Sequence, residues 1–224
     1  MNDRPRPQIL IVDSHPLTRR GMADFVYHEL GYEVRGAVPR LSDARAVMAE
    51  SEPDLLVCEL EFPNDDALQF IQETRAQYPS VQVLVVSSMN ELIYARRSLD
   101  AGASGYVHKS ASPDVLGEAF AEALAGNLWV SREVTRYLLG RVLQPVGQQA
   151  ANGNGSACEV VSSLSNRELQ VFRMAGDGLK TGEIAAALGI SPRTVESHKE
   201  HIKEKLGLGT AAELAAQATL WLGR

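Results

Sequence analysis

Five side chains that could carry out phosphoryl transfer follow apolar, strand-like segments in the first half of the 224-residue sequence. They are Asp13, Ser14, Glu59, Ser87 and Lys109. Carboxylates can hold a metal ion or accept a phosphoryl group, and hydroxyl and ammonium groups can bind its oxygens. In a parallel sheet the carboxyl ends of the strands meet at one edge. The five residues therefore predict a phosphoryl-transfer site at that edge.

The segments that must position these residues alternate between two patterns. Apolar, β-rich runs predict strands at 8–12, 33–38, 54–60, 81–87 and 104–108. Amphipathic stretches predict helices at 17–30, 42–50, 67–77, 92–101 and 113–125. Five strands alternating with five helices predict an α/β fold, a doubly wound five-stranded parallel sheet covered on both faces.

A second, all-helical part follows a linker. A predicted helix at 131–143 leads into residues 144–156, which are rich in Gly, Gln and Asn and predict a flexible linker. Four helices are predicted beyond it, at 165–175, 181–188, 192–206 and 210–222. A short helix, a glycine turn and a helix capped by Ser191-Pro192 are the components of a helix-turn-helix. The expected division is 1–127, 128–161 and 162–224.

The composition and the motifs exclude several classes of protein. Apolar runs fall far short of the roughly 20 residues that span a bilayer, and Cys58 and Cys158 show no disulfide or zinc spacing. No glycine-rich turn follows the first strand, so a dinucleotide or P-loop site is excluded. We expect a cytoplasmic protein with no membrane association, and no enzyme beyond residual phosphoryl chemistry.

The net charge of −6 is unevenly distributed. Residues 1–143 hold 14 basic and 20 acidic residues, whereas residues 144–224 hold 8 of each. A nucleic acid would therefore meet the neutral C-terminal part of the chain rather than the acidic part.

Several strings carry a family resemblance. They are Ile9-Leu-Ile-Val-Asp-Ser-His-Pro16, Ala101-Gly-Ala-Ser-Gly-Tyr-Val-His-Lys109, Ile190-Ser-Pro-Arg-Thr-Val-Glu-Ser-His198 and Lys205-Leu-Gly-Leu208. Residues 8–125 resemble a response-regulator receiver domain, which has a flavodoxin-like fold, and residues 162–222 resemble a LuxR-type helix-turn-helix domain. Their order is that of the NarL/FixJ class. The resemblance implies a transcription regulator of a two-component system that binds double-stranded DNA.

The receiver site departs from this family at two positions. Such receivers carry two adjacent acids after the first strand and a phosphate-accepting aspartate on the third, where this chain has Ser14 and Glu59. Losing an anionic ligand should leave Mg²⁺ binding weak or absent, with Asp13 and Glu59 as vestiges of the site and no cofactor expected. The extra methylene displaces the Glu59 carboxylate by about 1.5 Å, and about 1 Å can cost on the order of 100-fold in rate. We expect no phosphorylation of Glu59.

Two hypotheses remain open for Glu59. Its carboxylate could bind Lys109 and the Ser87 hydroxyl, holding the loop after the fourth strand as a phosphoryl group would. Tyr106 matches the switch aromatic of the family and would then be biased toward one conformer. Alternatively, Glu59 and Lys109 form a structural ion pair and nothing switches. A protein partner at the receiver could supply the signal in either case.

Three further residues that could carry chemistry are expected to have no catalytic or redox role. His15 and His108 have no nucleophile at a readable spacing and are expected to be solvated or packed at strand ends. Cys58 is expected to be a small buried apolar residue rather than a redox sensor.

The resemblance also assigns the DNA contacts. Glu196, Ser197 and Glu200 would face the bases, and glutamate can accept from the amine of cytosine. The expected backbone contacts are Lys180, Arg193, Thr194, Lys199 and Lys203. Glu196, Glu200 and Glu204 also share one face of the helix, which turns an acidic stripe toward a polyanion.

Few cations are therefore available, and a monomer should bind DNA weakly. A homodimer would compensate by reading two half-sites, and the apolar face of the last helix resembles the dimer helix of the family. That face comprises Leu214, Ala218, Trp221 and Leu222. The alternative is that it packs on its own domain. The alternative function is a protein-interaction module with weakened DNA binding.

Overall fold

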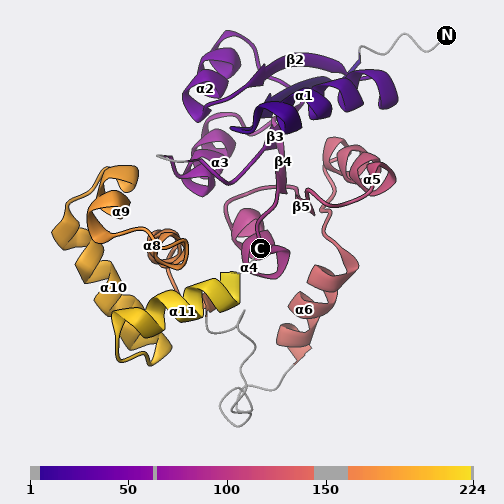
Figure 1. Cartoon of the computed structure of the whole chain (residues 1–224). Coiled ribbons are helices and arrows are strands. Elements are labelled where there is room, and N and C mark those ends of the chain that lie inside the picture. The colour runs from indigo at the N-terminus through magenta and orange to yellow at the C-terminus, as the bar shows by residue number, and fades with distance from the viewer. Residues whose placement is uncertain (1–5, 63–64, 144–160, 223–224) are drawn as a thin grey trace. The chain divides into compact units, whose positions relative to one another are not determined.

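The computed structural model describes residues 6–62, 65–143 and 161–222 (Figure 1). The chain divides into two units, Met1–Leu138 and Leu139–Arg224. The predicted flexible linker at 144–156 lies outside the described residues. Among the helices of the described ranges, none is long and apolar enough to cross a membrane.

The first unit contains the predicted five-stranded parallel sheet. Its strands are β1 (Gln8–Val12), β2 (Glu33–Val38), β3 (Leu55–Cys58), β4 (Gln82–Ser87) and β5 (Gly105–His108). They lie in the order β2-β1-β3-β4-β5, and every neighbouring pair is parallel. The prediction of a doubly wound sheet is confirmed. The carboxyl ends of β1 and β3, which are adjacent in the sheet, bring Asp13 and Glu59 side by side.

Helices cover both faces of this sheet. They are α1 (Pro16–Asp24), α2 (Leu41–Glu50), α3 (Ala67–Gln77), α4 (Glu91–Asp100) and α5 (Pro113–Leu124), and α6 (Arg132–Leu143) follows them. The single helix predicted at 17–30 instead ends in a π-helical turn, η1 (Phe25–Glu29), in which the Leu30 amide donates to the Phe25 carbonyl.

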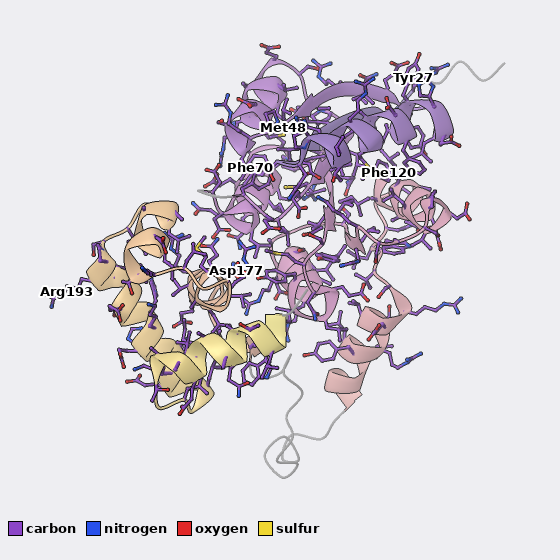
Figure 2. All side chains as sticks on the ribbon, viewed as in Figure 1. Tyr27, Met48, Phe70, Phe120, Asp177 and Arg193 are labelled. Atoms are coloured by element: carbon purple, nitrogen blue, oxygen red, sulfur yellow. The ribbon has the colours of Figure 1, made fainter. Side chains whose placement is uncertain are left out.

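The two faces follow from the alternation of side chains along each strand. Ile9 and Ile11 pack in one core cluster with Val26 and with Phe120 of α5. Leu10 points the other way, and a Cβ atom at Gly36 of β2 would meet it at 3.2 Å and Val47 of α2 at 3.8 Å. Phe70 of α3 and Phe120 lie on opposite sides of the sheet (Figure 2). This two-sided core explains why the strands read as nearly unbroken apolar runs.

A short strap after α5 extends the sheet beyond β5, which the sequence did not predict. The Trp129 amide donates to the Ser104 carbonyl at 2.9 Å, and the Trp129 carbonyl accepts from the Tyr106 amide at 3.1 Å. A Cβ atom at Gly105 would lie 2.5 Å from the Trp129 carbonyl oxygen. Glycine is therefore required where the strap approaches the strand.

The second unit is helical in its described residues, as predicted. Its helices are α8 (Asn166–Gly176), α9 (Thr181–Leu188), α10 (Pro192–Leu206) and α11 (Ala211–Leu222). Ser165 and Glu168 form the predicted capping box, and Ser191 caps α10. Gly189 ends α9 with φ +63°, a left-handed conformation that favours glycine. The turn between α9 and α10 therefore has the geometry of a helix-turn-helix.

Two residues of the apolar face of α11 pack on their own domain, which is the alternative that the sequence left open beside a dimer surface. Leu214 and Ala218 are buried, and a Cβ atom at Gly176 of α8 would meet Ala218 at 2.8 Å. The Trp221 ring lies 6.2 Å from the ring of Phe172. The close helix contact that Gly176 allows accounts for the burial of Ala218 against α8. The side chain of Leu222 lies outside the described residues.

Candidate functional site

The strand ends bring together most of the predicted phosphoryl-transfer residues. Lys109 Nζ lies 2.7 Å from Asp13 Oδ2 and also contacts Glu59 Oε2. Asp13 and Glu59 are buried, and the Lys109 side chain is 15% exposed. The Lys109 amide donates to the Ser87 carbonyl at 2.9 Å, which holds the end of β5 against β4. One ammonium thus serves two carboxylates.

The Glu59 carboxylate turns toward its own loop as well as toward Lys109. Oε1 accepts from the amides of Leu60 at 2.6 Å and Glu61 at 3.2 Å, and Oε2 has the Lys109 ion pair as its contact. Among the described residues no hydrogen bond joins Glu59 to Ser87, so the first hypothesis for Glu59 has its Lys109 contact here but not its Ser87 contact. The backbone amides of Leu60 and Glu61 after β3 donate to the carboxylate of this longer side chain instead.

Ser14 and His15, which follow Asp13, contact the same cluster of side chains and the loop after β3. Asp13 Oδ1 accepts from the His15 amide at 2.8 Å and lies 3.1 Å from His15 Nδ1. The Ser14 hydroxyl donates to the Glu61 carbonyl at 3.0 Å, which ties the loop after β1 to the loop after β3. Ser14 therefore contributes a bond between two loops where the family places an acid.

The cluster of Asp13, Glu59 and Lys109 does not fit the Mg²⁺ ion that the family implies. Asp13, His15 and Glu59 offer ligand atoms within 4.8 Å of one another. However, all four carboxylate oxygens of Asp13 and Glu59 already have partners, two in Lys109 and two in backbone amides and His15. Mg²⁺ demands a near-octahedral oxygen shell. An ion would compete with the Lys109 ammonium for Asp13 Oδ2 and Glu59 Oε2.

The charges around Lys109 determine its protonation. Burial alone would lower the pKa of the ammonium, but the charges of Glu59 and Asp13 and the bonds to them outweigh burial and raise it above its usual 10.5. Lys109 is therefore a stable cation at neutral pH.

The predicted switch residue, Tyr106, faces inward. Its side chain is fully buried, and its hydroxyl donates to the Met89 carbonyl at 2.6 Å. The Met89 amide in turn donates to the Ser87 hydroxyl at 3.3 Å. Burial raises the pKa of the Tyr106 phenol, so it remains a neutral donor. Tyr106 and Ser87 hold the loop between β4 and α4 from both sides.

His108 and Cys58 have structural positions. His108 Nδ1 lies 2.6 Å from the Ser110 hydroxyl, and Nε2 lies 3.1 Å from the Ser88 carbonyl, so the ring joins two surface loops. Cys58 is fully buried, and burial, followed by the charges of Glu59 and Asp13, raises its thiol pKa well above 9.0. A protonated buried thiol is a poor nucleophile.

The predicted DNA-contacting residues lie on the outer side of α10 and at the start of α9. Successive residues of a helix are 100° apart, and Val195 and Ile202 mark the buried side. Arg193 in the first turn points away from the core of this unit (Figure 2). The other exposed members of the set are Lys180, Thr194, Glu196, Ser197 and Glu200.

The two predicted lysines of α10 are bound to glutamates. Lys203 Nζ lies 2.9 Å from Glu200 Oε1, and the Lys203 side chain is 18% exposed. Lys199 Nζ lies 3.4 Å from Glu196 Oε1, and the Lys199 side chain is 14% exposed. The acidic stripe is therefore partly neutralised by the helix itself. These ion pairs also engage Lys199 and Lys203, the two lysines that are predicted to contact DNA phosphates.

Thr181 is a residue that the sequence reasoning missed. It is the first residue of α9, and its hydroxyl donates to Glu196 and accepts from Lys199 Nζ at 2.7 Å. The contact joins residues fifteen positions apart across the turn, a separation at which no local helical spacing signals a pair.

The comparisons with known proteins agree with this architecture. Residues 9–121 match the response regulator receiver domain, and residues 162–218 match the luxR family of bacterial regulatory proteins. The transcriptional activator protein ExaE of Pseudomonas putida is 34% identical over 207 residues, 92% of each chain. The response regulator GacA of Pseudomonas aeruginosa is 28% identical over 211 residues, 94% of each chain.

A solved structure shares the fold. RcsB from Salmonella enterica serovar Typhimurium, bound to promoter P1flhDC in the presence of the phosphomimetic BeF3-, has a TM-score of 0.69 at 24% identity over 96% of this chain and 99% of that one. The predicted order of a receiver domain and a helix-turn-helix is confirmed. The chain belongs to the response regulators of the NarL/FixJ class, DNA-binding transcription regulators with a LuxR-type helix-turn-helix domain.

Proposed function

We propose that this response regulator controls transcription without aspartyl phosphorylation of its receiver. The observation that carries the proposal is the position of Glu59, whose two carboxylate oxygens bind Lys109 and the amides of its own loop. Phosphoryl transfer needs an acceptor oxygen that is free to attack in line and a metal to neutralise the developing charge. The acceptor position offers neither.

Ser14 also supports the proposal that the receiver is not phosphorylated. Its hydroxyl is engaged by the Glu61 carbonyl, and it carries no charge with which to hold a divalent cation. Restoring phosphorylation therefore requires changes at both positions, with Asp13, Ser87 and Lys109 kept.

The receiver state would be set by contacts that need no phosphoryl group. Lys109 is held by Glu59 and Asp13, and the inward Tyr106 holds the Met89 carbonyl. In this proposal the loop between β4 and α4 stays in one conformer. A protein partner at the receiver, rather than a kinase, would supply any change of state.

We further propose that the helix-turn-helix domain binds double-stranded DNA as a homodimer in the cytoplasm. Glu196, Ser197 and Glu200 would meet base edges. Arg193, Thr194, Lys180, Lys199 and Lys203 would meet the DNA backbone. The proposed domain limits are 1–127 for the receiver, 128–161 for the linker helix and the linker after it, and 162–224 for the DNA-binding domain.

Mass spectrometry of the full chain tests the first proposal. Incubation with a small phosphodonor and Mg²⁺ should leave the intact mass of the wild-type protein unchanged, and a Ser14→Asp, Glu59→Asp double variant should gain one phosphoryl group. Mg²⁺-dependent phosphate on Glu59 of the wild-type chain would overturn the proposal.

DNA-site selection at low salt tests the second, and an enriched palindromic site is expected. The affinity of Glu59→Gln for that site then separates the two hypotheses for Glu59. A locked receiver predicts weaker binding when the Lys109 pair is lost. A purely structural pair predicts unchanged binding by the folded variant.

A further inference from the structure

Three side chains from α9 and α10 form a closed cluster at the helix-turn-helix. The Thr181 hydroxyl donates to Glu196 Oε1 and accepts from Lys199 Nζ at 2.7 Å, and Lys199 Nζ lies 3.4 Å from the same carboxylate oxygen. Lys199 is 14% exposed, whereas Glu196 is 55% exposed. In this cluster the Lys199 ammonium is therefore largely shielded from solvent, whereas the Glu196 carboxylate is exposed.

Both bonds fall on one oxygen of Glu196. Among the described residues, no donor reaches Oε2, which leaves it as the outward acceptor. The bond from Thr181 is the largest reason that the pKa of Glu196 lies below its usual 4.5, and the Lys199 charge adds to it. A free glutamate samples many rotamers, and this one is held in one of them before a ligand arrives. Such preorganisation removes part of the entropic cost of binding.

We infer that Thr181 is a positioning residue that fixes Glu196 to accept from the exocyclic amine of a cytosine. This inference rests on the proposed DNA binding. In the major groove, cytosine presents the N4 amine alone, whereas adenine presents its amine beside the N7 acceptor. Guanine and thymine present acceptor oxygens. A carboxylate is repelled by those acceptors, so cytosine is the base that a fixed Glu196 selects.

Lys199 has a second part in this arrangement. A carboxylate brought near phosphates is opposed by their charge, and the adjacent ammonium offsets that repulsion. Because Thr181 accepts from Lys199 and donates to Glu196, its hydroxyl keeps both charges together at the joint between the helices. A simple brace between α9 and α10 would use the same bonds but would have no base preference.

Two substitutions at Thr181 separate positioning from bracing. Thr181→Val keeps the branched shape and removes the hydroxyl, and Thr181→Ser keeps the hydroxyl. Each full-length variant is titrated with the selected duplex, with the same duplex carrying T·A in place of the read C·G pair, and with a random-sequence duplex. Glu196→Gln serves as the reference for loss of the carboxylate, and thermal unfolding of each variant reports folding.

We expect wild type and Thr181→Ser to prefer the C·G duplex by about 5- to 150-fold, the range that one good base contact supplies. Thr181→Val should lose most of that preference while its affinity for the random duplex and its salt slope stay unchanged. Glu196→Gln should lose the preference as well, but its affinity for the random duplex should rise, because it removes a negative charge beside Lys199. If Thr181→Val fails to fold, Thr181→Ala repeats the test with a residue of better helix propensity.

Three outcomes overturn the inference. The first is a folded Thr181→Val variant that retains the preference, and the second is a Thr181→Ser variant that loses it. The third is a Thr181→Val variant that loses affinity equally for every duplex, as a brace would. Failure of the proposed function looks different, because the wild-type chain would then select no site and bind no duplex at all.

Discussion

Lys109 Nζ lies 2.7 Å from Asp13 Oδ2 while it also contacts Glu59, so one ammonium is the ion-pair partner of two buried carboxylates. Burying a charge without a partner is costly, and here two charges depend on the same partner. This charged cluster therefore joins the ends of β1, β3 and β5.

Lys109→Met should destabilise the receiver by about 3 to 5 kcal/mol, because it leaves both carboxylates buried and unpaired. Urea unfolding of the full chain, followed by Trp129 fluorescence in a Trp221→Phe background, measures the change. Adding Glu59→Gln should recover part of the loss, since an amide oxygen can still accept from the Leu60 amide. A loss below about 1 kcal/mol, as for an exposed pair, would contradict this.

Glu168 should make the stability of the DNA-binding domain depend on pH, with less stability at low pH. Burial alone would raise its pKa, but the bonds from Lys205, at 2.6 Å, and from Ser165 outweigh burial and lower it below 4.5. A folded-state pKa below the unfolded value contributes stability above pH 4.5 that is lost as pH falls through the lowered value.

Glu168→Gln should therefore cost about 1 to 2 kcal/mol at pH 7, and this difference from wild type should shrink below pH 4.5. Urea unfolding followed by Trp221 fluorescence in a Trp129→Phe background measures it at each pH. A difference that is constant from pH 7 to pH 3 would show that the Glu168 charge does not stabilise the fold.

The positions of the strand ends were predictable, whereas the directions of the side chains were not. β1 and β2 lie at the predicted residues because their apolar runs are bounded by polar turns. The turn of Glu59 onto the amides of Leu60 and Glu61 depends on the path of the chain after β3, which no spacing encodes.

Contacts between distant segments escaped prediction for the same reason. The burial of the α11 face depends on the close approach that Gly176 allows to Ala218, and an apolar stripe alone fits either a dimer or a core. The capping box of Ser165 and Glu168 was predictable because its two members are three residues apart.

Glu200→Ala should change both affinity and specificity. It releases Lys203, now 2.9 Å from Glu200, and removes a negative charge, so affinity for random duplexes should rise. It should also flatten the preference at one base pair by roughly 1 to 3 kcal/mol. Competition binding to single-base-pair variants of the selected site measures both effects.

Glu204→Ala is the matched control for Glu200→Ala. It removes the same charge from an exposed position on α10, but Glu204 has no ion pair among the described residues, so the change releases no lysine. Affinity should rise less, and base preference should stay unchanged. If the two variants behave alike, the Glu200 pair with Lys203 has no part in DNA binding.

Arg193 is the cleanest probe of the phosphate contacts. Lys199→Ala would also break the Thr181 cluster, whereas Arg193 is exposed in the first turn of α10 and has no hydrogen bond or ion pair among the described residues. Arg193→Ala should weaken every DNA sequence about equally. The salt slope should become shallower by about one unit, as expected for one lost phosphate contact.

Arg193→Lys distinguishes a phosphate contact from a base contact. Lysine keeps the charge, so a phosphate contact predicts nearly unchanged affinity and salt slope, both measured by titration at several salt concentrations. An arginine that binds guanine through two bonds in one plane cannot be replaced by the single ammonium of lysine. Loss of preference at one G·C pair in Arg193→Lys, with the slope unchanged, would therefore place Arg193 on a base edge and contradict its assignment to the backbone.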